Sequence, residues 1–329
     1  MSNVTFAVLG AGSWGTAVAM HLSMRGQKVL LWGRDASHVQ AMTKSQENTR
    51  YLPGIPFAES LTPEANLESC ITQATHLIIA VPSHAFAELL NKLPETTKNL
   101  AWITKGLDPQ KNQCLSELVA ARWGKNFPMA VISGPSFARE VARGLPTAIV
   151  IAGNNSDYMQ CLHDALHYHN LRAYFSHDLI GVQCAGAVKN VLAIACGISD
   201  GLNYGANAKA ALITRGLAEM TRFGTALGGL PETFTGLTGL GDLVLTCTDD
   251  QSRNRRFGLL IGQGEAIPEA EKSIGQVVEG KHNANQVCTL AKTNGLELPI
   301  CHEVNELLQG KISAEDAVQN LLNRPPKEE

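Results

Sequence analysis

The first half of the chain alternates short apolar runs with stretches that fit helices, and this alternation limits the fold more than any other feature. The runs TFAVLG, KVLLWG, THLIIAVP, LAWITKG, MAVISG and TAIVIAG are rich in Val, Ile and Leu. Helices are predicted between them, for example over Thr16–Arg25, Ala85–Lys92 and Cys114–Trp123. Continuously apolar strands that alternate with helices indicate an α/β domain, a doubly wound parallel sheet covered on both faces.

The second half of the chain has a different pattern. One more strand is predicted in RAYFSHD, Arg172–Asp178, and after it the sequence is rich in Ala, Leu and Gly to about Leu322. A length of 329 residues favours two domains over one core. We therefore predict an α/β domain over residues 1–178 and an all-α C-terminal domain over residues 179–329.

Composition and charge exclude several classes of protein. The hydrophobic share is 44% and the charged share 17%, which are ordinary for a soluble globular protein. A net charge of -3 argues against a nucleic-acid or anionic-membrane partner. The eight cysteines form no C-x-x-C pair, which predicts reduced thiols, a cytoplasmic location and no metal site.

The N-terminus lacks the features of a signal peptide. One stretch, around Lys189, is apolar and nearly long enough to span a bilayer. It carries Gln183, Lys189 and Asn190 in its middle, so we predict a buried helix and no integral membrane segment.

The first predicted strand runs directly into a glycine motif. FAVLGAGSWGTAVA contains Gly10-x-Gly12-x-x-Gly15 between a strand and a helix. In a dinucleotide site, such glycines permit a tight turn, the approach of a pyrophosphate, and close packing of helix on strand. The backbone amides of Ser13 and Trp14 are then expected at the phosphates, although Trp14 also fits a packing role.

The end of the second strand bears on which cofactor binds. NAD sites carry an acidic residue there for the ribose hydroxyl groups. KVLLWGRD instead has Arg34 before Asp35. Arg34 suits the 2′-phosphate of NADP, so NADP use is predicted with NAD also accepted; a solvated surface arginine is the alternative.

Two further strand ends carry polar groups. WITKG places Lys105 at one, and ISGPSFAREV places Gly134, Pro135 and Ser136 at another. Ligands of such sheets bind outside the carboxyl ends of the strands, so these groups could surround a small oxygen-rich substrate. A surface charge and a simple turn are the alternatives.

The segment TCTDDQSRNRRFGLL predicts a helix that begins after Ser252 as N-cap. Arg253, Arg255 and Arg256 occupy its first turn, where the helix dipole disfavours cations. A bound phosphate, held by Arg253, Asn254 and the free N–H groups, would compensate this charge. The alternative is that some of these arginines pair with Asp249 and Asp250.

Lys189 is the only charged residue between Asp178 and Asp200. Burying an unpaired ammonium costs several kcal/mol. Small residues surround it at helical spacing and leave room for a close neighbour or a ligand. In a dry cleft the pKa of a lysine can be lowered to about 7–8, so that it can exchange a proton with a carbonyl or alcohol oxygen. A structural ion pair is the alternative.

The long stretch GAVKNVLAIACGISDGLNYGANAKAAL resembles the bacterial-type NAD(P)-dependent glycerol-3-phosphate dehydrogenases. GAGSWGTA, YLPG, TKGL, SGPSFA, TGLGDL, SRNRRFG and VVEG match the same family in the expected order. The resemblance covers nearly the whole chain. It implies a Rossmann domain followed by a helical domain, usually paired into a homodimer.

The resemblance also implies roles for individual residues. Lys189 falls on the proton donor and acceptor, which also contacts the substrate. Cofactor positions are matched by Gly10, Gly12, Ser13, Trp14, Gly15, Arg34, Lys105, Ala138, Arg253, Val277 and Glu279. Substrate positions are matched by Lys105, Gly134, Ser136, Asp242, Ser252, Arg253 and Asn254. Asp242 could bind a substrate hydroxyl, orient the lysine, or cap a loop.

The implied reaction is the reversible reduction of dihydroxyacetone phosphate to sn-glycerol 3-phosphate, the backbone of glycerophospholipids, with NADP or NAD as cofactor. Two other functions stay open from the residues alone. One is a related dehydrogenase of a sugar acid or nucleotide sugar, which would need a nucleophilic cysteine such as Cys184 or Cys196. The other is a nicotinamide-binding sensor without turnover.

Overall fold

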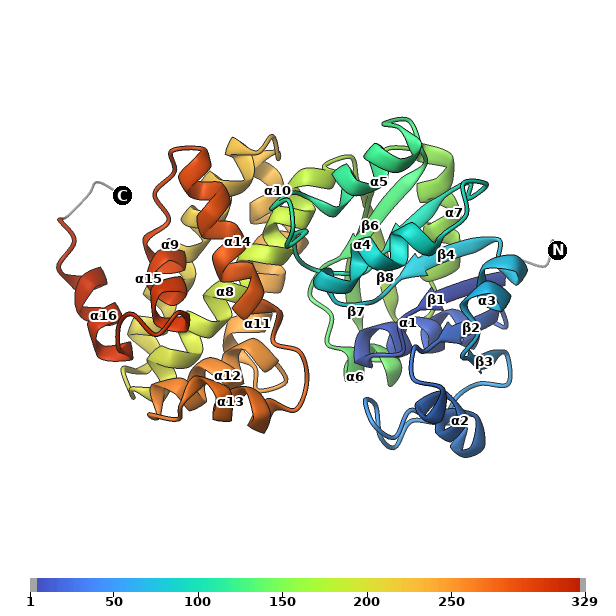
Figure 1. Ribbon diagram of the computed structural model, residues 1–329, viewed down its shortest axis with the longest axis horizontal. Coiled ribbons are helices and arrows are strands. Elements are labelled where there is room, and N and C mark those ends of the chain that lie inside the picture. Colours follow the sequence, from blue (N-terminus) through green and yellow to red (C-terminus); the bar gives the residue numbers. More distant parts are fainter. Residues whose placement is uncertain (1–4, 326–329) are drawn as a thin grey trace. The chain divides into compact units, whose positions relative to one another are not determined.

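The computed structural model describes residues 5–325 (Figure 1). Its internal contacts divide the chain into two compact units. The first comprises the residues up to Thr104 together with Leu115–Leu179, and the second comprises Lys105–Cys114 together with the residues from Ile180 onward. The predicted boundary at 178/179 placed Lys105–Cys114 in the first domain, whereas in the structure this segment packs with the second unit. This segment belongs to the helical unit because Leu107 and Cys114 are buried in that unit's core.

The described part of the first unit forms an eight-stranded sheet in the order β3-β2-β1-β4-β5-β6-β7-β8. The strands are β1 (Thr5–Leu9), β2 (Lys28–Trp32), β3 (Leu61–Glu64), β4 (His76–Ile79), β5 (Leu100–Trp102), β6 (Met129–Ser133), β7 (Thr147–Gly153) and β8 (Leu171–Ser176). Neighbouring strands from β3 to β6 pair in parallel, and every residue of β1 is buried. This is the predicted α/β domain with a mostly parallel, doubly wound sheet.

Two features of the sheet differ from the prediction. β7 is antiparallel to β6, although β7 and β8 are parallel to each other. The connection from β6 to β7 holds only the five-residue helix α6 (Ala138–Ala142), which is too short to span a strand and return the chain in parallel. β3 was not predicted, because Pro63 interrupts its pattern; proline is tolerated there because β3 is an edge strand.

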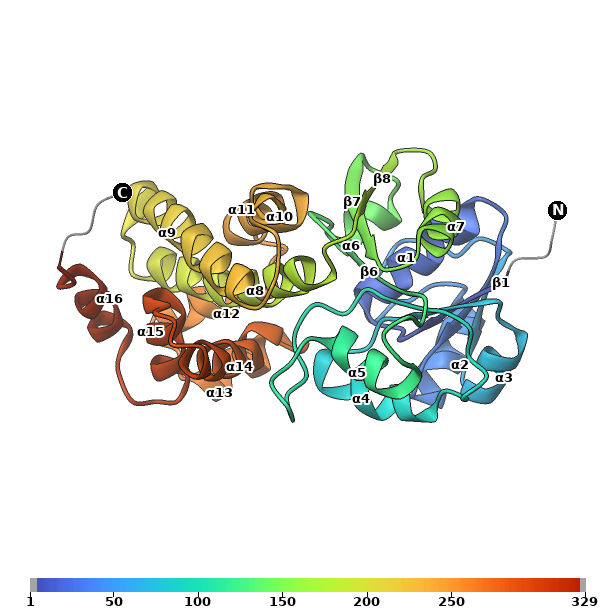
Figure 2. The ribbon, with the colours of Figure 1, turned by 90° about the horizontal axis from the view of Figure 1, so that it is seen from above.

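Helices cover both faces of the sheet (Figure 2). α1 (Ser13–Met24) packs against α6 and α7 (Ser156–Leu166) on one face, and α4 (Ser83–Lys92) packs against α5 (Leu115–Trp123) on the other. The remaining helices of this unit are α2 (Ala36–Ser45) and α3 (Leu67–Gln73). The three helices predicted between strands are therefore confirmed as α1, α4 and α5, with small shifts at their ends.

From Leu179 onward, the regular elements of the described residues are all helices, as predicted, whereas the Lys105–Cys114 segment of the second unit contains no helix. The helices are α8 (Leu179–Gly201), α9 (Gly205–Ala226), α10 (Pro231–Thr235), the π-helix η1 (Leu237–Gly241), α11 (Asp242–Thr248), α12 (Arg253–Gly262), α13 (Ile267–Ile274), α14 (Glu279–Thr293), α15 (Pro299–Leu308) and α16 (Ala314–Leu322). α8 is long and apolar enough to cross a membrane by length and composition alone. Its most apolar window is 89% buried within the protein, as in the core helix of a soluble protein.

The packing of α12 on α8 depends on glycines. A Cβ atom on Gly197 would lie 2.0 Å from the backbone oxygen of Arg255, and one on Gly258 would lie 2.1 Å from that of Ile194. Larger residues at these positions would force the two helices apart. The small residues near Lys189 predicted room for a close neighbour or a ligand. At Gly197, that room is occupied by the backbone of α12.

Candidate functional site

The glycine motif shapes the N-terminus of α1 in the sheet unit. Gly10 has a φ of 138°, and a Cβ atom there would lie 2.7 Å from the carbonyl carbon of Ala80. A Cβ atom on Gly15 would lie 2.0 Å from the oxygen of Gly10, whereas one on Gly12 would meet no atom within 4 Å. The turn and the helix packing thus require glycine, and the space beside Gly12 suits an approaching group.

The start of α1 also has the polarity expected of an anion site. No side chain caps it, and its first turn contains no acidic residue. The N–H groups of Ser13, Trp14 and Gly15 have no acceptor within the helix, because the first turn of any helix leaves its donors unpaired. The indole Nε1 of Trp14 is buried and has no partner among residues 5–325. These features fit the pyrophosphate of a dinucleotide cofactor.

A buried amide holds this turn in place. The Asn48 side chain is fully buried and donates to the Ala11 backbone oxygen at 3.0 Å and to Thr16 Oγ1 at 2.7 Å. Its own oxygen accepts from the Tyr51 backbone N–H at 3.2 Å. The sequence analysis missed Asn48, because nothing in the local sequence connects it with the glycine motif.

At the end of β2, Asp35 and Arg34 have different surroundings. Asp35 is the N-cap of α2, and its Oδ1 atom accepts hydrogen bonds from the Ser37 backbone at 3.0 Å and the His38 backbone at 3.2 Å. The side-chain bond from Ser37 and these backbone bonds hold the pKa of Asp35 below its ordinary value. Arg34 is exposed. Asp35 is therefore engaged locally, while the Arg34 guanidinium faces solvent.

The SGPSFA segment turns the chain after β6. Gly134 has a φ of 129°, a conformation that favours glycine, and its oxygen accepts a 3.0 Å hydrogen bond from Ser136 Oγ. Ala138 is the first residue of α6 and is half-buried. The Ser133 hydroxyl is buried without a partner in the part of the chain that the structure describes.

In the helical unit, Asp242 lies between two lysines. Lys189 Nζ is 2.6 Å from Asp242 Oδ1, and Lys105 Nζ is 2.7 Å from Asp242 Oδ2. The carboxylate side chain is 2% exposed and that of Lys189 is 6% exposed. Three predicted site residues, far apart in sequence, thus form one buried cluster. Lys189 therefore has an ion-pair partner in Asp242, an arrangement that both the structural and the catalytic interpretation of Lys189 allow.

Burial and charge alter the proton affinities in this cluster. Desolvation lowers the pKa of Lys189 to about 7, with a further lowering from Lys105 and an opposing rise from Asp242. Burial alone would raise the pKa of Asp242, but the ammonium groups of Lys105 and Lys189 outweigh it and keep that pKa below its ordinary value. Asp242 therefore stays ionised near neutral pH, whereas the pKa of Lys189 lies close to neutral pH.

Thr246 completes the surroundings of the lysine. Lys189 Nζ donates to Thr246 Oγ1 at 3.0 Å, and Thr246 lies one helical turn after Asp242 on α11. A lysine ammonium has three N–H donors, so the bonds to Asp242 and Thr246 leave one. Sequence reasoning missed Thr246, although its spacing of four residues from Asp242 on a helix was a usable signal.

The start of α12 carries the predicted cap. Ser252 is the N-cap, and its hydroxyl oxygen accepts a 3.2 Å bond from the Arg255 backbone N–H. Arg255 forms ion pairs with Asp200, at 2.6 Å, and with Asp250. The alternative that acidic residues neutralise some of the arginines is therefore confirmed for Arg255. Arg253 is half-buried, with one nitrogen 3.4 Å from Gln276 Oε1, and Arg256 is exposed.

Asn254 and the residues before α14 complete the predicted set. Asn254 is buried; its amide nitrogen donates to Asn190 Oδ1 at 2.9 Å and its oxygen accepts from the Gly280 backbone at 3.0 Å. Glu279 is the first residue of α14 and half-buried, and Val277 is exposed. The buried polar residues Asn190, Asn283 and Gln286 were not predicted as site residues. Asn190 stands out as a polar residue in the apolar helix α8, whereas Asn283 and Gln286 lie among other polar residues of α14 and carry no such signal.

The cysteines, possible metal ligands and a cavity are further candidate functional features, outside the cluster of Lys105, Lys189 and Asp242. Cys184 and Cys196 are buried, and hydrogen bonding from Cys196 together with burial raises the pKa of Cys247 well above its ordinary value. Within the described residues, no group of three or more His, Cys, Asp or Glu side chains is placed to hold a metal.

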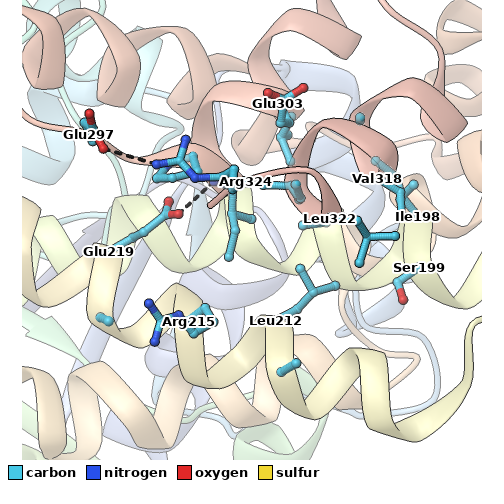
Figure 3. A pocket seen from close by; sticks show the side chains of 18 of the residues that line it. Ile198, Ser199, Leu212, Arg215, Glu219, Glu297, Glu303, Val318, Leu322 and Arg324 are labelled. Carbon is cyan, nitrogen blue, oxygen red and sulfur yellow. Dashed lines mark hydrogen bonds and ion pairs between the residues drawn. The ribbon is translucent and has the colours of Figure 1, made fainter. Parts of the chain in front are cut away.

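A cavity of about 720 Å³ lies among α8, α9, α15 and α16 (Figure 3). Most of the side chains that line it are apolar, and Arg215 and Arg324 line it as well. Lys189 and its partners do not line it.

Known proteins show the same division into an N-terminal and a C-terminal domain. Residues 5–159 match the N-terminal domain, and residues 178–319 the C-terminal domain, of NAD-dependent glycerol-3-phosphate dehydrogenase. The chain is 62% identical over 329 residues to glycerol-3-phosphate dehydrogenase [NAD(P)+] of Legionella pneumophila, covering 100% of both chains. It is 52% identical over 332 residues to the protein of the same description from Thioalkalivibrio sulfidiphilus, again covering 100% of both.

The fold agrees as well. A crystal structure of glycerol-3-phosphate dehydrogenase from Coxiella burnetii superposes with a TM-score of 0.95 at 49% identity, covering 98% of this chain and 99% of that one. The superposition thus extends over both the sheet-containing half and the helical half of the chain. The protein belongs to the family of NAD(P)-dependent glycerol-3-phosphate dehydrogenases.

Proposed function

We propose that this enzyme reduces dihydroxyacetone phosphate reversibly to sn-glycerol 3-phosphate with NADPH or NADH, and that Lys189 exchanges the proton. The observation that carries the proposal is the buried ammonium of Lys189. Its pKa is lowered to about 7, and it keeps one N–H beyond those bound by Asp242 and Thr246. A group with such a pKa can act both as an acid and as a base near neutral pH.

The proton transfer is assigned to a single atom. In the direction of reduction, Lys189 Nζ donates its remaining proton to the substrate carbonyl oxygen as it becomes the alcohol oxygen. The neutral amine then recovers a proton from solvent. Asp242 orients Nζ and stabilises its charged form, while Lys105 opposes that charge and keeps the proton labile. Oxidation of the alcohol uses the same groups in reverse.

The cofactor, when bound, supplies the hydride that the substrate carbon receives. Its pyrophosphate would be held by the N–H groups at the start of α1, next to Gly12, Ser13 and Trp14. The exposed Arg34 would meet the 2′-phosphate of NADP, whereas Asp35 is committed to capping α2. We assign Ala138, Val277 and Glu279 to the cofactor on the resemblance alone.

The substrate phosphate requires a separate site. The start of α12 offers the positive end of the helix dipole and the half-buried Arg253, whereas Arg255 is already neutralised by Asp200 and Asp250. Asn254 retains one amide hydrogen beyond its bond to Asn190. Gly134, Ser136 and Ser252 are assigned to the substrate by the same resemblance, and Lys105 and Arg253 to both ligands.

Neither alternative function gains support from an observation. Oxidation of a sugar to an acid would need a reactive thiolate, but Cys184 and Cys196 are buried. A sensor without turnover would not require a lysine of such low pKa beside a buried carboxylate. We further infer a cytoplasmic enzyme, in accord with the eight free cysteines. That it forms homodimers and supplies phospholipid synthesis is inferred from the family resemblance alone.

Lys189→Met should remove the proton donor while leaving Asp242 paired with Lys105, so the protein should still fold. We expect the rate to fall by about 10²–10⁴-fold, the usual contribution of general acid catalysis. The measurement is the loss of NADPH or NADH absorbance with dihydroxyacetone phosphate. The same substitution at the exposed Lys292 is the control. Undiminished turnover in folded Lys189→Met would refute the assignment.

The pH dependence should report Lys189 directly. Because reduction needs the protonated amine, kcat/KM should fall as the pH rises through about 7, and the rate of the reverse reaction should rise over the same interval. Asp242→Asn removes the charge that raises the pKa of Lys189, so both limbs should move to lower pH. Limbs that stay in place in this variant would assign the titration to another group.

Arg253→Ala should mainly weaken binding of dihydroxyacetone phosphate. Loss of a charge-assisted bond to the phosphate predicts a KM increase of roughly 10- to 100-fold. Arg256→Ala, an exposed arginine in the same helical turn, is the matched control and should leave KM near the wild-type value. Equal KM values for the Arg253 variant and the wild type would place the phosphate elsewhere.

The proposed homodimer is tested by light scattering on the protein eluting from a size-exclusion column. We expect the mass of two chains at micromolar concentration, as is usual for symmetric homo-oligomers. A mass that corresponds to one chain throughout the concentration range would contradict the dimer without affecting the proposed chemistry.

A further inference from the structure

A row of buried side-chain amides runs through the helical unit. Asn254 Nδ2 donates to Asn190 Oδ1 at 2.9 Å, and Asn190 Nδ2 donates to Asn283 Oδ1 at 3.2 Å. Asn283 Nδ2 then donates to Gln286 Oε1 at 3.0 Å. The four residues are between 0% and 9% exposed. Polar groups buried to this degree are costly unless each is hydrogen-bonded, and here each amide both donates and accepts.

Backbone groups terminate the row and fix its direction. The Gly280 N–H, which can only donate, bonds Asn254 Oδ1 at 3.0 Å. The Leu107 carbonyl, which can only accept, receives Gln286 Nε2 at 3.1 Å. Turning any one amide around would place two donors or two acceptors in contact. All five bonds therefore point from Gly280 to Leu107, and each polarises the next.

The row joins the segments that carry the proposed chemistry. Asn190 follows Lys189 on α8, Asn254 follows Arg253 on α12, and Leu107 lies two residues after Lys105. α12 and α14 both pack against α8 (Figures 1 and 2). A Cβ atom on Gly280 would lie 2.6 Å from the Asn190 backbone oxygen and 2.9 Å from Asn254 Oδ1, so this close approach of α14 requires glycine at position 280.

Neither Asn283 nor Gln286 bonds the Lys189–Asp242 cluster, yet Gln286 supports it through the Lys105 segment. Lys105 binds Asp242 from a stretch without helix or strand, Lys105–Leu107. Gln286 binds the carbonyl of Leu107, a fully buried residue. Without that donor the carbonyl would lose a buried partner, and the segment that positions Lys105 would relax.

We propose that Gln286, which the row of amides holds against the Leu107 carbonyl, is a positioning residue that keeps Lys105 against Asp242. The proposal rests on the proposed function only in its kinetic consequence. Lys189 faces Asp242 and Lys105, with Thr246 and the Cys247 thiol on α11 nearby. Lys105 is the one cation among them that opposes its protonation.

Gln286→Met tests the proposal, because methionine keeps the length of the side chain and removes both amide groups. If Lys105 relaxes away, the pKa of Lys189 should rise, since the repulsion that lowers it is lost. The pKa is followed by NMR of ¹⁵Nζ-labelled lysine without substrate, with Lys189→Met to assign the signal. Asn285→Met, an exposed amide beside Gln286 on α14, is the matched control and should leave the titration unchanged.

In Gln286→Met we expect kcat to fall by roughly 10- to 100-fold, because the proton donor is displaced. The affinity for NADPH, measured by fluorescence, should stay unchanged. The falling limb of kcat/KM should move to higher pH. If Gln286→Met does not fold, Gln286→Asn, one methylene shorter, should shift the same titration in the same direction. An unchanged Lys189 pKa in a folded variant overturns the positioning role. Failure of the wild type to oxidise either cofactor overturns the proposed function, and the titration still decides the role of Gln286.

Discussion

The buried carboxylate of Asp242 is the interaction on which the helical unit's site depends. It is nearly inaccessible to solvent and accepts from Lys189 on one oxygen and from Lys105 on the other. A buried carboxylate without such partners would be protonated, and a buried lysine without one would lose its charge. With two cations on one anion, the cluster carries an excess positive charge. Burial of Lys189 and, to a smaller degree, this excess charge lower the pKa of Lys189.

The rest of the helical unit holds the side chains of Lys105, Lys189 and Asp242 in contact. α8 contributes Lys189 and α11 contributes Asp242 and Thr246. Glycines bring α12 against α8 closely enough for Asn254 to bond Asn190. The amides then continue through α14 to the Lys105 segment. Each of these helices would otherwise be free to slide along an apolar surface, because hydrophobic packing alone is not directional.

Much of both the fold and the candidate site could be predicted from the sequence. The strand pattern gave the mostly parallel sheet, since period and composition are local properties. It failed at β3, where Pro63 hides an edge strand, and at β7, whose direction depends on the preceding connection. Lys189 stood out because a single charge in an apolar helix demands an explanation. Thr246 could be found only through its spacing of four residues from Asp242, and Gln286 did not stand out because it lies among other uncharged polar residues of α14.

The sequence by itself determined the glycine turn, the order of the elements, the family, and which charged residues deserved attention. These follow from short-range rules of backbone conformation and from the cost of burying charge. Only the tertiary structure decided the partners of Lys189, the assignment of Arg255 to Asp200, and the direction of the amide row. Lys105, Lys189 and Asp242 meet through the packing of separate segments, and Gln286 reaches them through the Leu107 carbonyl. The pKa shifts of Lys189 and Asp242 arise from burial and from the neighbouring charges, which no local stretch of sequence contains.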